Sequence, residues 1–233
     1  MYLGFDPIYF MFLAPAMLLA FWAQMKVKTA YASASKIPAN RGITGAEAAS
    51  LILESSGMNN VGIEQAQGFL SDHYDPRRKV LRLSNDVYNG RSLASLGIAA
   101  HEAGHAIQDR DGYAPLRIRN GIVPLAGFGG NFSLILFFIG LAVNSFNLVL
   151  AGIILYSMVV IFQLVNLPVE FNASTRAKEV LVNRGIVSPD EVRTVDKVLD
   201  AAALTYVAAT ITAIMTLLYF LFKAGLLGGR RRN

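Results

Sequence analysis

Apolar residues gather in four long runs along the chain, and two mostly polar segments separate them. The runs cover about residues 8–25, 122–143, 146–167 and 203–222. Each run approaches the roughly twenty apolar residues that an α-helix needs to cross the hydrocarbon core of a bilayer. The pattern therefore predicts a mainly α-helical membrane protein with about four transmembrane helices.

The runs divide the chain into five predicted parts. The second and third runs are separated only by Asn144 and Ser145, which leave room for a tight turn and no more. A hairpin there returns the chain to the face from which it started, so both polar segments lie on one side of the membrane. The parts are an N-terminal transmembrane anchor (1–25), a large polar segment (26–121), a transmembrane hairpin (122–167), a short polar helical segment (168–202) and a C-terminal transmembrane helix with a basic tail (203–233).

The large polar segment carries signals for short elements of both kinds. Thr44 followed by Glu47 forms a capping box, which predicts a helix over 44–56 that ends at Gly57. Basic and apolar residues alternate over 79–84, a pattern typical of a short, exposed edge strand. Ser92 is a helix cap, and the helix it begins is predicted over 93–108. This α+β region is expected to be zincin-like.

Composition supports the membrane assignment and narrows the function. Hydrophobic residues make up 54% of the chain and charged residues only 16%, whereas soluble domains carry about a quarter charged residues. The net charge of +5 comes without any recognised nucleic-acid-binding module, so we expect no nucleic-acid partner. The chain has no cysteine, which excludes disulfides and thiolate metal sites.

The distribution of basic residues predicts the orientation. Segment 26–121 holds twelve lysines and arginines and segment 168–202 holds five, whereas the amino-terminal tip and the hairpin turn hold none. The positive-inside rule therefore places both polar segments in the cytoplasm. The tail, with Lys223 and arginines 230–232, argues against this orientation, because four full spans would place it outside.

The predicted helix 93–108 contains an HExxH motif. His101 and His105 are four residues apart and so lie on one face of the helix, where both imidazoles reach a single metal ion. Glu102 is placed to act as general base on a water at that metal. The pattern predicts a zinc hydrolase. If this helix itself lay in lipid, the enzyme would be an intramembrane protease, but charges at both ends leave it short for a span.

Two histidines leave a catalytic zinc site short of a third protein ligand. Glu170 follows Pro168 at the end of the third run, where a charge is costly unless it is used. Pro168 suits the first turn of a new helix, and the helix dipole is then a second explanation for Glu170. Asp109 is a rival ligand, since it continues the four-residue spacing of the histidines, although it lies at the end of the helix.

These strings together resemble a known family. Residues 101–108 (HEAGHAIQ), preceded by 71–76 (SDHYDP) and followed by 168–174 (PVEFNAS), are similar to the YugP-type neutral membrane zinc metallopeptidases of bacteria. The resemblance covers nearly the whole chain, including the order of the spans. It implies a zinc-dependent peptidase anchored in the bacterial cytoplasmic membrane.

A more remote resemblance links Glu170 to the third-ligand motif of the HtpX and CAAX-prenyl-protease group. There the glutamate is followed three residues later by alanine and then by aspartate. Here Ala173 matches, but Ser174 replaces the aspartate. The resemblance thus carries the ligand role to Glu170 and leaves open whether Ser174 orients a metal-binding histidine.

A peptidase also needs a group that stabilises the oxyanion of the reacting carbonyl. His73 and Tyr74 are the candidates, because both are polar and lie next to the predicted strand. His73 has a second interpretation as a turn residue bound to local backbone. Arg176 could pair with Glu170 or with a substrate carboxylate, or could simply border the membrane.

The sequence as a whole favours a multi-pass zinc metalloendopeptidase, gluzincin-like in its ligand set, that acts on protein or peptide substrates at the bilayer. Its catalytic site is predicted to face the cytoplasm. The alternative is a non-hydrolytic membrane adaptor or assembly factor with a structural metal, whose site would be closed by a fourth ligand such as Asp109 or His73. The sequence leaves the oligomeric state open.

Overall fold

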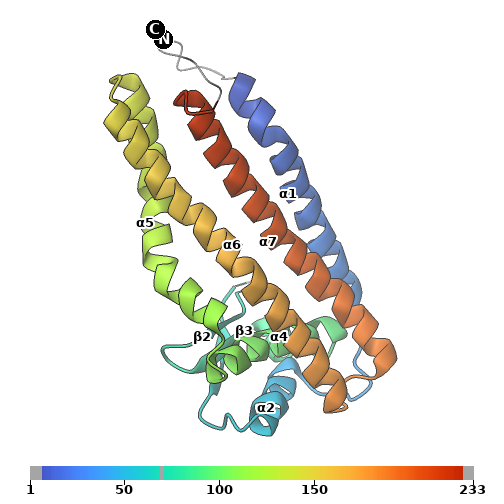
Figure 1. Cartoon of the computed structure of the whole chain (residues 1–233). Helices are drawn as coiled ribbons and strands as arrows, with labels where there is room; N and C mark the ends of the chain where they lie inside the picture. Colours follow the sequence, from blue (N-terminus) through green and yellow to red (C-terminus); the bar gives the residue numbers. More distant parts are fainter. Residues whose placement is uncertain (1–6, 69–70, 228–233) are drawn as a thin grey trace. The chain divides into compact units, whose positions relative to one another are not determined.

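The computed structural model describes residues 7–68 and 71–227, so the amino-terminal tip and arginines 230–232 lie outside the described residues. The described chain is mostly helical with three short strands (Figure 1). In chain order the elements are α1 (Pro7–Ala34), α2 (Gly45–Ser55), β1 (Gly62–Ala66), β2 (His73–Asp75), β3 (Val80–Ser84), α3 (Asn85–Tyr88), α4 (Leu93–Arg110), α5 (Ala114–Ala142), α6 (Phe146–Asn183) and α7 (Pro189–Lys223).

Four of these helices are long and apolar enough to cross a membrane: α1, α5, α6 and α7. Each contains one of the four apolar runs of the sequence. The prediction of a mainly α-helical membrane protein with about four transmembrane helices is therefore confirmed for the described residues.

The chain divides into two compact units. We call residues 1–23, 118–167 and 205–233 the membrane unit, and residues 24–117 and 168–204 the α/β unit. The membrane unit contains the most apolar parts of the four long helices. The α/β unit contains all three strands, the short helices and α4.

Inside the membrane unit, small residues let helices approach closely. A Cβ on Gly152 of α6 would lie 2.8 Å from the backbone of Phe137 in α5, and one on Gly140 would lie 2.6 Å from Val149. Glycine at both positions allows α5 and α6 to pack as a hairpin around the turn at Asn144. Phe137 also stacks on Phe220 of α7, with ring centroids 4.0 Å apart.

The helix containing Glu170 differs from the prediction. Helix α6 continues without interruption from Phe146 to Asn183, with Pro168 inside it, so no new helix begins at that proline. Proline removes one backbone hydrogen bond, but long helices beside other helices tolerate that loss. Glu170 therefore lies in the middle of α6, and a helix N-terminus does not explain its charge.

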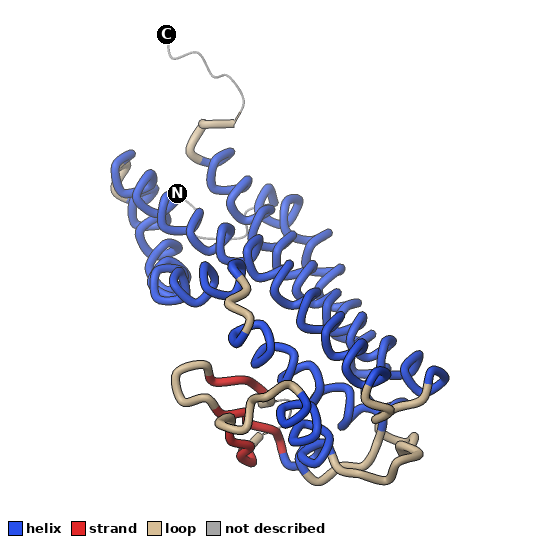
Figure 2. The backbone as a smooth tube through the Cα atoms, turned by 60° about the horizontal axis from the view of Figure 1, so that its bottom comes forward, coloured by secondary structure: helices blue, strands red, loops and turns tan. Residues whose placement is uncertain are grey.

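The strands form one small mixed sheet in the order β1-β3-β2 (Figure 2). Strand β1 pairs with β3 in parallel, and β2 pairs with β3 antiparallel. The strand predicted over 79–84 is present as β3, but it is the central strand rather than an edge. Its two neighbours were not recognised, because β1 lacks clear alternation and β2 is only three residues inside a turn-like string.

The α/β unit has its own hydrophobic core, to which α2, the sheet, α4 and the end of α6 contribute. The predicted caps are present: Thr44 and Glu47 form the capping box of α2, and Ser92 caps α4. Helix α4 is not among the candidate spans of the described chain. It is a core helix of the α/β unit, which does not favour the intramembrane version of the site.

Candidate metal centre

Helix α4 presents both motif histidines on one face. The ring centroids of His101 and His105 are 4.8 Å apart and the rings are nearly perpendicular. The side chains are 14% and 10% exposed, so both imidazoles are largely removed from water. The neighbouring residues Ala103, Gly104 and Ala106 are buried, and their small size allows another helix to pack closely against α4 here.

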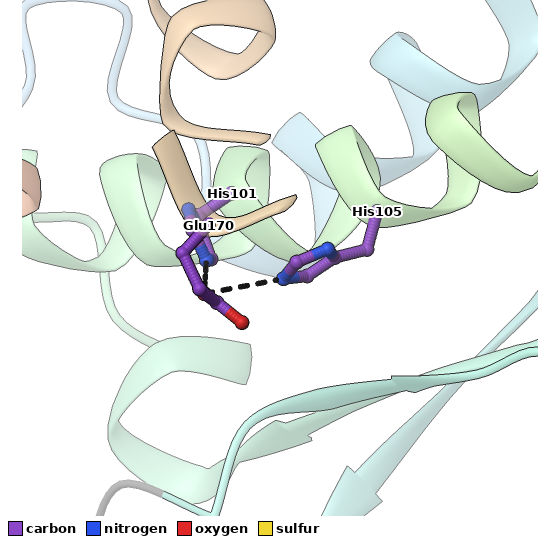
Figure 3. A group of neighbouring side chains, drawn as sticks. All are labelled: His101, His105 and Glu170. Atoms are coloured by element: carbon purple, nitrogen blue, oxygen red, sulfur yellow. Dashed lines mark ion pairs between the residues drawn. The ribbon is translucent and has the colours of Figure 1, made fainter. Parts of the chain in front are cut away.

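Helix α6 brings Glu170 to the same place (Figure 3). Its Oε2 atom lies 3.3 Å from His101 Nε2 and 3.6 Å from His105 Nε2. One ligand atom from each residue lies within 4.8 Å of the other two, and among the described residues these three form the possible metal-binding group.

The distances from Glu170 Oε2 to the two imidazole nitrogens fit a zinc ion. Zinc bonds of about 2.1 Å in a tetrahedral arrangement place neighbouring ligand atoms about 3.4 Å apart. The carboxylate oxygen of Glu170 is buried and accepts no hydrogen bond, although both imidazoles face it. A buried carboxylate oxygen without a partner is costly, and a cation bound between the three groups would remove that cost.

Gly104 makes the approach of the two helices possible. A Cβ at this position would lie 2.6 Å from the backbone oxygen of Ala173 in α6. Ala173 is itself fully buried. The small residue inside the HExxH motif thus lets Glu170 reach the histidines.

Each histidine has a partner for its other ring nitrogen. Ser174 Oγ lies 3.2 Å from His101 Nδ1, so the serine occupies the orienting position that the remote resemblance left open. Gln108 Oε1 lies 3.0 Å from His105 Nδ1. Both contacts leave the Nε2 atoms directed at Glu170. A hydrogen-bond partner at the other ring nitrogen is usual for metal-binding histidines.

The carboxylates around His105 change its protonation. Burial alone lowers the pKa of His105, but the carboxylates of Glu170 and Glu102 outweigh burial and raise the pKa above its ordinary value. Glu102 is itself 8% exposed and follows His101 directly. In the metal-free protein the site therefore attracts a cation, either a proton on His105 or a metal ion.

The two oxyanion candidates take different positions. Tyr74 is part-buried, and its hydroxyl donates to Asp109 Oδ2 of α4 at 2.8 Å. Burial and this bond to Asp109 raise the pKa of Tyr74, which keeps the phenol protonated. His73 is exposed, with Nδ1 2.8 Å from the Ser71 carbonyl. Successive residues of a strand face opposite sides, so only Tyr74 turns toward α4.

The other charged residues weighed in the sequence have partners away from the three-residue group. Asp109 binds Tyr74 and Lys79 and is not a member of the group. Arg176 donates to Asn172 and pairs with Asp111. The structure thus places Arg176 in a bridge between α6 and the end of α4, and no contact with Glu170 is found for it among the described residues.

Sequence reasoning assigned no role to Gln108 and Asn172. Gln108 is fully buried and donates to Val169 O and Asn172 Oδ1. Gln108 lies three residues after His105, on the same helix face, and a polar residue there is the signal that could have revealed it. Its partners on α6 were not visible without the fold.

The chain is similar to known proteins over nearly its whole length. Residues 9–225 match the family model described as "Putative neutral zinc metallopeptidase". The chain is 47% identical over 225 residues to a Bacillus subtilis (strain 168) protein named "Putative membrane protease YugP", covering 96% of this chain and 99% of that protein. No solved structure matches the chain.

Proposed function

The chain belongs to the neutral zinc metallopeptidase family, and from this premise we propose that it is a membrane metalloendopeptidase that hydrolyses peptide bonds of protein substrates. The observation that carries the proposal is the convergence of His101, His105 and Glu170 on one point beside Glu102. Two histidines and a glutamate from a separate helix form a gluzincin-like ligand set.

In this proposal each residue has one role. His101, His105 and Glu170 would hold the zinc, through the two Nε2 atoms and the carboxylate oxygen that face one another. When bound there, zinc supplies Lewis-acid chemistry, which makes a water more acidic and polarises the scissile carbonyl. Glu102 accepts the proton of the attacking water and returns it to the leaving amine.

We assign stabilisation of the oxyanion to Tyr74, which lies on β2 and faces α4. Tyr74 carries a phenol that stays protonated and can donate. To act on a substrate it must exchange its bond to Asp109 for one to the developing oxyanion. His73 lies on the opposite face of β2, where it is exposed and faces the Ser71 carbonyl, so nothing in the geometry favours it over Tyr74.

An extended substrate has a strand edge available beside the site. Strand β2 is an edge strand of the described sheet and pairs there with β3, so we propose that its other edge receives an added substrate strand. Tyr74 connects β2 to α4 directly. Strand addition would supply backbone hydrogen bonds that do not depend on the substrate's side chains.

A structural metal site, as in an adaptor, gains no support from the described residues. The two groups proposed to close such a site are engaged elsewhere, because Asp109 binds Tyr74 and Lys79 and His73 is exposed. Three protein ligands leave a fourth position for water, which is the arrangement of catalytic zinc.

The proposed location is the bacterial cytoplasmic membrane, with segments 26–121 and 168–202 on the cytoplasmic side. The four apolar helices and the membrane-protease relative support a multi-pass membrane protein. The lysine and arginine count supports the orientation. Within the proposed division, 26–121 supplies the HExxH helix and 168–202 the third ligand.

Metal content and peptide cleavage of three purified chains test the proposal. Wild type should hold one zinc and cleave. Glu102→Gln should retain zinc and lose cleavage by roughly 10²- to 10⁴-fold, the range of general acid–base catalysis. Glu170→Gln should lose zinc and cleavage together. If Glu102→Gln cleaves like wild type, Glu102 is not the general base and the proposed mechanism is wrong.

A further inference from the structure

One buried amide connects the two helices that carry the candidate ligands. Gln108 on α4 has no exposed surface. Its Oε1 atom lies 3.0 Å from His105 Nδ1, and its Nε2 atom donates to Val169 O at 2.8 Å and to Asn172 Oδ1 at 3.0 Å. Both acceptors belong to α6, and Val169 precedes Glu170 in the chain.

The amide of Gln108 can take only one orientation. A backbone carbonyl such as Val169 O accepts hydrogen bonds and never donates them, so the NH₂ group must face it. Asn172 Oδ1 also accepts from Arg176 Nε at 2.8 Å. Because a guanidinium group only donates, Arg176 holds the oxygen of Asn172 toward Gln108. Two independent partners thus fix the same orientation.

This orientation decides where His105 carries its proton. With its NH₂ group turned to α6, Gln108 presents only its oxygen to His105. The contact is a hydrogen bond only if Nδ1 of His105 is the donor. A proton on Nδ1 leaves the lone pair of a neutral imidazole on Nε2, the atom that faces Glu170.

His101 lacks such a constraint. Its Nδ1 atom faces the hydroxyl of Ser174, which can either donate or accept. The two histidines therefore differ: the partners of His105 impose one protonation pattern, whereas the partner of His101 permits both.

We propose that Gln108 is a positioning residue, which keeps a proton on His105 Nδ1, prepares Nε2 as the metal-binding nitrogen and fixes α4 to the segment of α6 that carries Glu170. The inference rests on the proposed function, because positioning His105 matters only if a metal binds there. The hydrogen bonds themselves are formed in the metal-free protein. Asn172 and Arg176 act through Gln108.

The first test uses the metal-free wild-type chain in detergent. The chain has three histidines, so a nitrogen-15 and proton NMR spectrum of the imidazoles is simple, and His105→Gln identifies the signal of His105. We expect a proton on Nδ1 that exchanges slowly with water. An unprotonated Nδ1, or one that exchanges as fast as that of exposed His73, would overturn the proposal, whether or not the protein binds zinc.

The second test compares zinc affinity in two variants. Gln108→Met keeps a similar shape and removes all three hydrogen bonds, so zinc should bind roughly 10- to 100-fold more weakly, and the slowly exchanging proton should disappear. Leu181→Ala is the control, since Leu181 is fully buried in the hydrophobic core of the α/β unit and its apolar side chain takes no part in the hydrogen bonds of Gln108. Its truncation lowers stability.

If Gln108 contributed only to stability, Gln108→Met and Leu181→Ala would weaken zinc binding equally when they lower the free energy of unfolding equally. That result would contradict the proposal. Full zinc affinity in folded Gln108→Met would contradict it as well. If wild type keeps the protected Nδ1 proton but binds no zinc, the hydrogen-bond assignment stands and the proposed metal function fails.

Discussion

At the residue scale, the chemistry of the site depends on which side chains surround the ligands. Glu170 Oε2 faces the Nε2 atoms of both histidines and accepts no hydrogen bond, whereas each histidine has a partner at Nδ1. Ser174 stands where the remotely similar group has aspartate, and it is a neutral partner for His101. A neutral hydrogen bond supports the ligand less than a charged one would.

Ser174→Ala should weaken zinc binding roughly 2- to 12-fold, because one neutral hydrogen bond contributes about 0.5–1.5 kcal/mol. The neighbouring Thr175→Ala is a matched control, since the exposed Thr175 hydroxyl bonds to the Phe171 carbonyl of its own helix and not to a histidine. Competition for zinc with a chelating dye measures both variants. Equal affinities in the two would show that the contact with His101 contributes nothing.

At the element scale, the site depends on how closely α4 and α6 approach. Their contact at Gly104 leaves no room for a side chain, and Gln108 bonds the same two helices further along. Because Pro168 does not end α6, Glu170 is held within a continuous helix. The position of Glu170, the proposed third ligand, is therefore set by helix packing and not by a loop.

Gly104→Ala should destabilise the protein by about 1–3 kcal/mol, as overpacking does, and should weaken zinc binding because it separates the helices. Gly97→Ala is its control: a Cβ there would lie 2.9 Å from the Val195 side chain of α7, which carries no ligand. That variant should lose stability but keep zinc affinity. Thermal unfolding and zinc titration separate the two effects, and tight zinc binding by Gly104→Ala would refute the argument.

At the scale of the whole molecule, the proposed metal site and the proposed membrane topology each involve distant parts of the chain. The proposed ligands come from two helices, because Glu170 follows His105 by 65 residues and His101 by 69 residues in the sequence. A metal bound by both helices stabilises the folded chain relative to the unfolded one.

Chelation of zinc should therefore lower the unfolding temperature of wild type. At free zinc about 100-fold above Kd the stabilisation that is lost is about 2.7 kcal/mol. Glu170→Gln, which lacks the third ligand, should show little response to the chelator. Calorimetry with and without chelator measures the difference. An unchanged unfolding temperature in wild type would mean that no tightly bound metal connects the helices.

The absence of cysteine from the chain allows a direct test of topology. Single Asn60→Cys and Arg193→Cys variants should react with an impermeant thiol reagent only from the cytoplasmic side, and Ser145→Cys only from the opposite side. Intact cells and inverted vesicles provide the two sides. Reaction of Asn60→Cys in intact cells would reverse the proposed orientation.

Local patterns in the sequence were enough to predict the four apolar helices, the caps of α2 and α4, and the paired histidines around Glu102. Each of these depends on residues within a few turns of one another, so periodicity and spacing reveal them. The prediction for Glu170 came from resemblance and from its unusual position, and the structure places it beside the histidines.

Only the tertiary structure decided the rest. It made β3 the central strand, continued α6 through Pro168 and turned Asp109 toward Tyr74. It also joined Ser174 to His101 across 73 residues and Gln108 to Val169 across 61. Partners so far apart leave no periodic signal, because contact between them depends on how closely two helices pack and not on the sequence near either residue.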